Sequence, residues 1–129
     1  MKPHQLIGLP YRLGADPVKN HAADCLSLAR TVLKYYGIKS PAPTRDWYRR
    51  VRKKDFDIFK EELEKWGNET KQFNIGTVAL CKSEYGFGLA VYYEEGWINC
   101  GESEVRWSPL DGLEVVGSYS PQKSNYVKQ

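Results

Sequence analysis

The sequence predicts an α+β fold, with N-terminal helices packed on an antiparallel sheet of about five strands. Apolar residues in the first half recur at helical spacing, and those in the second half alternate with polar residues as in strands. A short turn at Glu94-Glu95-Gly96 joins two of the expected strands. Helices followed by neighbouring strands are typical of the α+β class.

Four helical segments are expected in the first half, over residues 2–8, 25–36, 44–54 and 56–66. The second is the clearest, because its apolar residues share one face and Gly37 follows it. The last three each have an N-capping side chain in front of them, namely Asp24, Thr44 and Asp55. Helix formation in this half is therefore specified locally.

Five strands are expected in the second half, over residues 76–81, 89–93, 97–100, 104–107 and 113–119. Residues 120–129 are polar and are expected to form a C-terminal tail or interaction arm. We therefore expect residues 1–119 to form a single domain.

Composition narrows the function classes. The chain has 129 residues, enough for one core, and a net charge of +3, too small to indicate nucleic-acid binding by itself. No apolar run is long enough to cross a bilayer, and the first residues lack the apolar segment of a signal peptide. We expect neither a membrane span nor a signal peptide.

The three cysteines, Cys25, Cys81 and Cys100, are far apart and form no Cys-x-x-Cys pair. With only two histidines in the chain, we expect no zinc site and no other cofactor. Cys81 and Cys100 lie in apolar strand-like runs and are expected to be buried free thiols.

Cys25 is the candidate nucleophile. It directly follows Asp24 at the start of the expected second helix, where free backbone N–H groups and the helix dipole favour a thiolate. A catalytic thiol also needs a base that can return a proton to the leaving group. The alternative interpretation of Cys25 is an inert, packed cysteine at a helix start.

The order of short motifs around Cys25 resembles the NlpC-type cell-wall peptidases, a papain-like family. The first matching stretches are Pro10-Tyr11-Arg12-Leu13-Gly14 and Asp24-Cys25-Leu26-Ser27-Leu28. The later ones are Gly76-Thr77-Val78-Ala79-Leu80, Phe87-Gly88-Leu89-Ala90-Val91 and Trp97-Ile98-Asn99-Cys100. The resemblance covers about residues 5 to 110 and implies an NlpC-type fold.

The resemblance also implies roles for individual residues. Cys25 matches the family's nucleophile, Tyr11 the tyrosine beside it, and Asn99 the polar residue that orients the catalytic histidine. The histidine position itself falls on Phe87, or on Gly86 if Gly88 is taken as the motif glycine. Neither residue can accept a proton, so we expect catalysis to be impaired.

A substitute base would have to be one of the two histidines. His21 lies four residues before Cys25 in the same loop, and His4 lies on the N-terminal segment. His21 is the better candidate of the two, because it could approach the sulfur from the loop side. The simpler interpretation is that His21 is an exposed loop histidine without a catalytic role.

A basic cluster, Arg45, Arg49, Arg50, Arg52, Lys53 and Lys54, precedes the acidic residues Glu61, Glu62 and Glu64. We interpret the cluster as a solvated helix face balanced by those acids, or as a docking surface for a protein partner. Since no nucleic-acid motif accompanies it, we expect no nucleic-acid binding.

The leading functional hypothesis is a catalytically impaired NlpC-type domain with a structural or recognition role. Small family members resemble phage tail-associated proteins, which implies tail-tip or baseplate proteins as partners, with peptidoglycan as a further candidate. It also implies location in the cytoplasm of the producing cell or in the virion. The alternatives are an active cysteine endopeptidase or amidase on peptidoglycan stem peptides, and non-enzymatic binding of a peptide or glycan in the remaining cleft.

Overall fold

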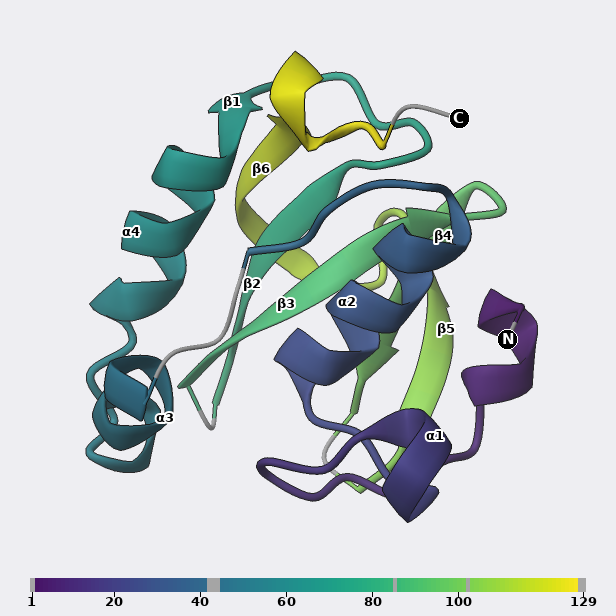
Figure 1. The fold of residues 1–129 in the computed structure, drawn as a ribbon, viewed down its shortest axis with the longest axis vertical. Coiled ribbons are helices and arrows are strands. Elements are labelled where there is room, and N and C mark those ends of the chain that lie inside the picture. The colour runs from purple at the N-terminus through teal and green to yellow at the C-terminus, as the bar shows by residue number, and fades with distance from the viewer. Residues whose placement is uncertain (1, 42–44, 85, 102, 128–129) are drawn as a thin grey trace.

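A computed structural model describes residues 2–41, 45–84, 86–101 and 103–127, and its class is α+β. The helical elements come first and are shown in Figure 1: η1 (Pro3–Leu6), α1 (Pro17–Asn20), α2 (Cys25–Tyr35), α3 (Arg45–Arg52) and α4 (Asp57–Trp66). The four helical segments expected from the sequence are confirmed. The expected cap at Thr44 lies outside the described residues. The expected cap at Asp55 is not met, because Phe56 stands at the N-cap of α4 and makes no side-chain capping hydrogen bond.

Helix α1 was not predicted from the sequence. It is one turn long, and its N-cap Asp16 accepts hydrogen bonds from the backbone N–H groups of Val18 and Lys19 at 2.9 and 3.0 Å. Pro17 occupies its first position, where a missing N–H leaves no donor unsatisfied. So short a helix has no room for the apolar periodicity that reveals longer ones.

The strands that follow form one antiparallel sheet. They are β1 (Gly67–Glu69), β2 (Val78–Ser83), β3 (Gly86–Tyr93), β4 (Gly96–Cys100), β5 (Val105–Pro109) and β6 (Glu114–Pro121). Their order in the sheet is β1-β6-β2-β3-β4-β5. The predicted count of about five strands was wrong, because the sheet has six strands within the described part of the chain.

The additional strand, β1, directly follows α4 and pairs with the end of β6, from Gly67 opposite Pro121 to Glu69 opposite Tyr119. Its sequence, Gly67-Asn68-Glu69, is polar and has no β-branched or aromatic residue. The strand therefore exists because β6 offers it a partner, not because of its own propensity.

The main core lies between the helices and one face of the sheet. Helix α2 contributes the buried residues Leu26, Leu28, Ala29, Val32 and Leu33, and the strands contribute Val78, Leu80, Leu89, Val91 and Ile98. Figure 1 shows α2 lying across this face and α4 beside the edge formed by β1 and β6. The core thus fixes the start of α2 against β3 and β4.

The opposite face of the sheet carries a second, smaller apolar cluster. Trp97 is fully buried there with Ala79 and Ala90, and the ring of Phe73 packs on it with centroids 5.0 Å apart. Because successive side chains of a strand point to opposite faces, Trp97 and Asn99 lie on this face while Ile98 and Cys100 lie on the helical face.

The segment after residue 119 is joined to the rest of the domain. Strand β6 continues to Pro121, and η2 (Lys123–Asn125) follows. The backbone N–H of Lys39 donates to Asn125 O at 2.7 Å, and that of Val127 donates to Gly37 O at 2.8 Å. Residues 128 and 129 lie outside the described residues.

The β2–β3 hairpin extends farther than the strand beside it. Its pairing continues to Ser83 opposite Gly86, whereas the β3–β4 pairing ends at Ala90 opposite Asn99. The hairpin end therefore projects past β4 toward α3, as Figure 1 shows. This divergence opens the sheet beside the start of α2.

The basic residues of α3 are partly neutralised by nearby acids. Arg50 pairs with Asp55 at 2.8 Å and with Glu61 at 2.6 Å, and Arg49 pairs with Asp46. These ion pairs agree with the interpretation of a balanced helix face. Among the described residues, no helix has the length and apolar character needed to cross a membrane.

Candidate functional site

Cys25 is the first residue of α2, as the sequence predicts. Asp24 caps the helix: its Oδ1 accepts the Ser27 backbone N–H at 2.7 Å, and Ser27 Oγ accepts the Asp24 N–H at 3.0 Å. This reciprocal capping box satisfies two backbone donors at the helix start. It fixes the backbone that carries the Cys25 thiol.

The turn at residues 10–14 holds Asp24 from the other side. The Gly14 N–H donates to Asp24 Oδ2 at 2.8 Å, and Gly14 adopts a φ of 84°, which glycine tolerates best. The Arg12 N–H donates to Ala23 O at 3.0 Å. These contacts give a physical reason for the spacing between the Pro-Tyr-x-x-Gly turn and the Asp-Cys pair.

Tyr48 of α3 completes the surroundings of Asp24. Its hydroxyl donates to Asp24 Oδ2 at 3.1 Å, so both carboxylate oxygens of this fully buried side chain are engaged. Sequence reasoning missed Tyr48, because nothing local connects α3 to the Asp-Cys pair.

Cys25 is partly buried, and its surroundings disfavour the thiolate. Burial raises its pKa to about 12, and the Asp24 carboxylate raises it further, while the Leu89 backbone amide acts in the opposite direction. The expectation that the helix start would favour a thiolate is therefore not met. Loss of solvent disfavours the charged form more than the helix N–H groups stabilise it.

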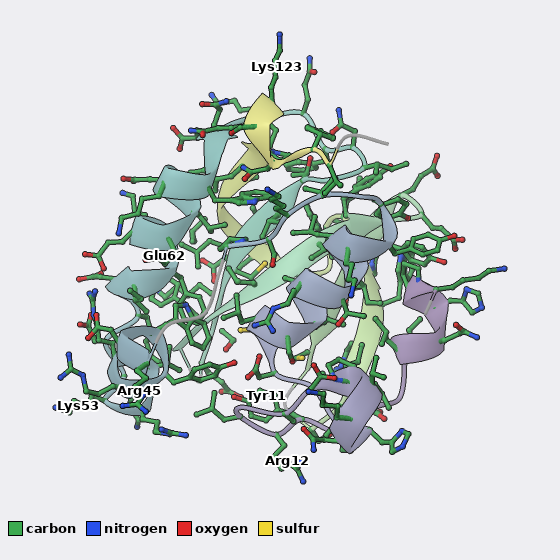
Figure 2. All side chains as sticks on the ribbon, viewed as in Figure 1. Tyr11, Arg12, Arg45, Lys53, Glu62 and Lys123 are labelled. Carbon is green, nitrogen blue, oxygen red and sulfur yellow. The ribbon has the colours of Figure 1, made fainter. Side chains whose placement is uncertain are left out.

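Tyr11 lies beside Cys25, as predicted. Figure 2 shows it below the first turn of α2, on the loop that also carries Arg12. Burial raises its pKa to about 12, and the nearby Cys25, Asp24 and Cys100 raise it further. The neighbouring acids thus oppose ionisation of Tyr11, Cys25 and Cys100, and we call Tyr11, Asp24, Cys25 and Cys100 the site cluster.

Cys100 was predicted as a buried thiol without a functional position, but it belongs to this cluster. It is partly buried, its Sγ lies 3.9 Å from Ala23 O, and burial, then Cys25, raises its pKa. Strand alternation could have found it, because Cys100 must face α2 if Asn99 faces away. Cys81 is also partly buried, with a pKa raised to about 12 by burial.

Asn99 does not reach the sulfur of Cys25 from the helical face. Its side-chain nitrogen lies within hydrogen-bond reach of Trp97 O at 3.2 Å, Arg106 O at 3.3 Å and Ser108 Oγ at 3.1 Å. Only 6% of Asn99 is exposed. The structure thus places Cys25 and Tyr11 next to each other, whereas the side-chain nitrogen of Asn99 is hydrogen-bonded to residues of β4 and β5.

The position expected for a catalytic histidine carries an aromatic ring instead. Phe87 is 37% exposed, and its ring packs on Phe56 with centroids 6.0 Å apart. Gly86 has a φ of 125° and lies under the same Phe56 ring. Neither residue supplies a proton acceptor near Cys25.

The two histidines lie elsewhere. His21 is exposed and ends α1 in the left-handed conformation, with a φ of 51°. His4 Nδ1 lies 3.5 Å from the Tyr93 hydroxyl. Neither is among the groups that affect the pKa of the Cys25 thiol, so the alternative in which His21 serves as the base has no geometric support, and the interpretation of an exposed loop histidine is confirmed.

A cleft of about 610 Å³ opens next to the site cluster. Its walls include Tyr11 and Cys25, side chains of α3 and α4, and the projecting end of the β2–β3 hairpin. Within the described residues, no group of three or more His, Cys, Asp or Glu side chains could hold a metal ion. The site therefore consists of a protonated thiol beside an open, largely apolar cleft.

The chain matches no protein-family model and no curated protein sequence. The NlpC-type resemblance consequently stays a prediction that rests on motif order.

Proposed function

We propose that this chain is a catalytically impaired NlpC-type domain that acts as a structural or recognition component of a larger assembly such as a phage tail. The observation that carries the proposal is the surroundings of Cys25. A nucleophilic thiol has to ionise, but the pKa of the Cys25 thiol is raised to about 12. The position at which the family resemblance expects the basic histidine is occupied by Phe87. A missing general base alone lowers a rate by about 10²–10⁴-fold.

Peptidoglycan turnover tests the impaired part of this proposal. Purified peptidoglycan is incubated with the wild-type protein and with Cys25→Ala, and the newly released amino groups are measured. We expect the two proteins to release equal, background amounts. Release that depends on Cys25 would contradict the proposal.

The assembly part needs a separate measurement. If the chain is expressed with the rest of its producing system, we expect it to co-purify in fixed stoichiometry with a particle. A free monomer that is absent from purified particles would overturn the structural role while leaving the question of turnover untouched.

A second candidate is an active cysteine endopeptidase or amidase on peptidoglycan stem peptides. It is favoured by one observation, namely that the cleft leads directly to Cys25 and Tyr11. Its base would have to come from a partner, because neither His4 nor His21 approaches the thiol. Turnover that appears only when a partner protein is added, and that is lost in Cys25→Ala, would support it.

A further inference from the structure

The cleft beside Cys25 owes its shape to the divergence of β3 and β4. Past the Ala90–Asn99 pair the two strands separate, and the β2–β3 hairpin leans toward α3 and α4. The resulting volume of about 610 Å³ falls within the range of about 300–1,000 Å³ that is usual for small-molecule sites.

The inner wall of the cleft is apolar and aromatic. Four rings follow one another from α3 across α4 to β3, with centroid distances of 5.2 Å for Trp47–Phe59, 6.0 Å for Phe56–Phe59 and 6.0 Å for Phe56–Phe87. On the other face of β3, which also carries Ala90, a Cβ added at Gly88 would meet no atom within 4 Å. Such a wall favours an apolar ligand body.

The charged side chains of the cleft are all cationic. Arg52, Lys54, Lys82 and Arg106 line it, and no described lining residue is acidic. The ion pairs among the described residues involve Arg49, Arg50, Lys60 and Lys65 instead. Four cations around one cleft produce a positive potential that attracts an anionic group.

We propose that this cleft binds an amphipathic anion, an aliphatic chain that ends in a carboxylate, as in a fatty acid. The chain lies along the aromatic wall, and the carboxylate is held by the cations. Burial of the methylene groups supplies most of the affinity, and the charges select the head group.

A peptide fits the same cleft less well. A bound peptide backbone needs donors and acceptors along its length, because its polar groups cannot be buried unpaired. The side-chain nitrogen of Asn99, a lining residue, is already engaged by Trp97 O, Arg106 O and Ser108 Oγ. The proposal goes beyond the proposed function, since binding needs neither an ionised Cys25 nor an assembly.

Calorimetric titration of the intact protein with sodium dodecanoate, below its micelle concentration, tests the proposal. We expect saturable 1:1 binding that is at least tenfold tighter than that of dodecyltrimethylammonium and that weakens as salt is added. Equal affinity for the two head groups, or no saturable binding of dodecanoate, would overturn the proposal. Saturable binding of an acidic apolar peptide without binding of dodecanoate would also overturn it.

Two kinds of variant locate the site. Lys54→Glu with Lys82→Glu reverses two cations of the cleft, and we expect at least a tenfold loss of affinity. The matched control is Lys71→Glu with Lys123→Glu, which changes the net charge equally at exposed positions outside the cleft and is expected to bind as wild type. Figure 2 shows Lys123 at the end of the molecule away from α3.

Phe87→Ser removes the partly exposed ring at the β3 end of the aromatic wall, so the protein should fold normally and bind dodecanoate at least tenfold more weakly. Thermal unfolding measured in parallel separates loss of binding from loss of fold. A folded Phe87→Ser variant with wild-type affinity would place the ligand away from the aromatic wall and contradict the proposal.

Discussion

At the scale of single residues, two effects act on Cys25 in opposite directions. The free N–H groups of a helix start lower a thiol pKa, and burial raises it. Burial is the larger effect here, and the adjacent Asp24 carboxylate adds to it. Asp24 therefore has a structural role as helix cap while it suppresses the reactivity of its neighbour.

Alkylation kinetics test this balance. With a pKa of about 12 in place of the ordinary 9.0, Cys25 should contain about 10³-fold less thiolate at pH 8 than a free thiol. We expect iodoacetamide to modify Cys25 correspondingly slowly, with a rate that rises about tenfold per pH unit. Mass spectrometry of each cysteine-containing peptide measures the rate.

Asp24→Asn removes the carboxylate charge and should raise the alkylation rate of Cys25. Asp16→Asn, at the cap of α1, is the matched control and should leave the rate unchanged, because Asp16 is not among the groups that shift the Cys25 pKa. A wild-type rate close to that of a free peptide thiol would show that the thiol is exposed and ionisable.

At the scale of elements, the C-terminal segment illustrates how a polar sequence is joined to a domain by hydrogen bonds. Residues 120–129 lack apolar periodicity, yet the Asn125 side chain donates to Trp66 O and the Asn125 carbonyl accepts from Lys39 N–H. Trp66 in turn donates its indole N–H to Lys39 O at 2.6 Å. This segment therefore links the end of α4 to the loop that follows α2.

Truncation after Pro121 tests that link. Truncation removes the two backbone hydrogen bonds that Asn125 and Val127 make to the loop, and at about 0.5–1.5 kcal/mol each this should lower the free energy of unfolding by about 1–3 kcal/mol. Urea unfolding followed by far-ultraviolet circular dichroism measures the change. Unchanged stability would instead support a free tail; removal of residues 128 and 129 alone is the control.

At the scale of the whole molecule, the buried acids set the dependence of stability on pH. Burial raises the pKa values of Cys25 and Cys81 from 9.0 to about 12, and raises that of Cys100 as well. Between about pH 9 and pH 12 the buried thiols stay protonated in the folded protein, whereas they ionise in the unfolded chain. The stability contribution is therefore complete below about pH 9 and is lost as pH rises toward 12.

Urea unfolding between pH 7 and pH 11 measures this effect. We expect the free energy of unfolding to be nearly constant up to about pH 9. Above that pH it should decrease by up to about 1.4 kcal/mol per pH unit for each buried thiol. Cys81→Ala should make the decrease shallower by the contribution of one thiol. Equal slopes for the two proteins would show that Cys81 ionises freely in the folded state.

The sequence was sufficient for features that depend on nearby residues. The cap at Asp24, the start of α2 at Cys25 and most strands follow from local hydrogen bonding and side-chain periodicity. Strand β1 and helix α1 could not be found in the same way. The first depends on a partner strand about 50 residues away, and the second is too short to show a period.

By itself, the sequence determined the α+β class and the position of Cys25 at a helix start, since both arise from local patterns. Only the tertiary structure decided whether that cysteine is reactive, because a pKa depends on burial and on charges brought together by folding. Likewise, the residues of the positively charged cleft come from α3, α4 and the strands. Their combination exists only where β3 and β4 separate.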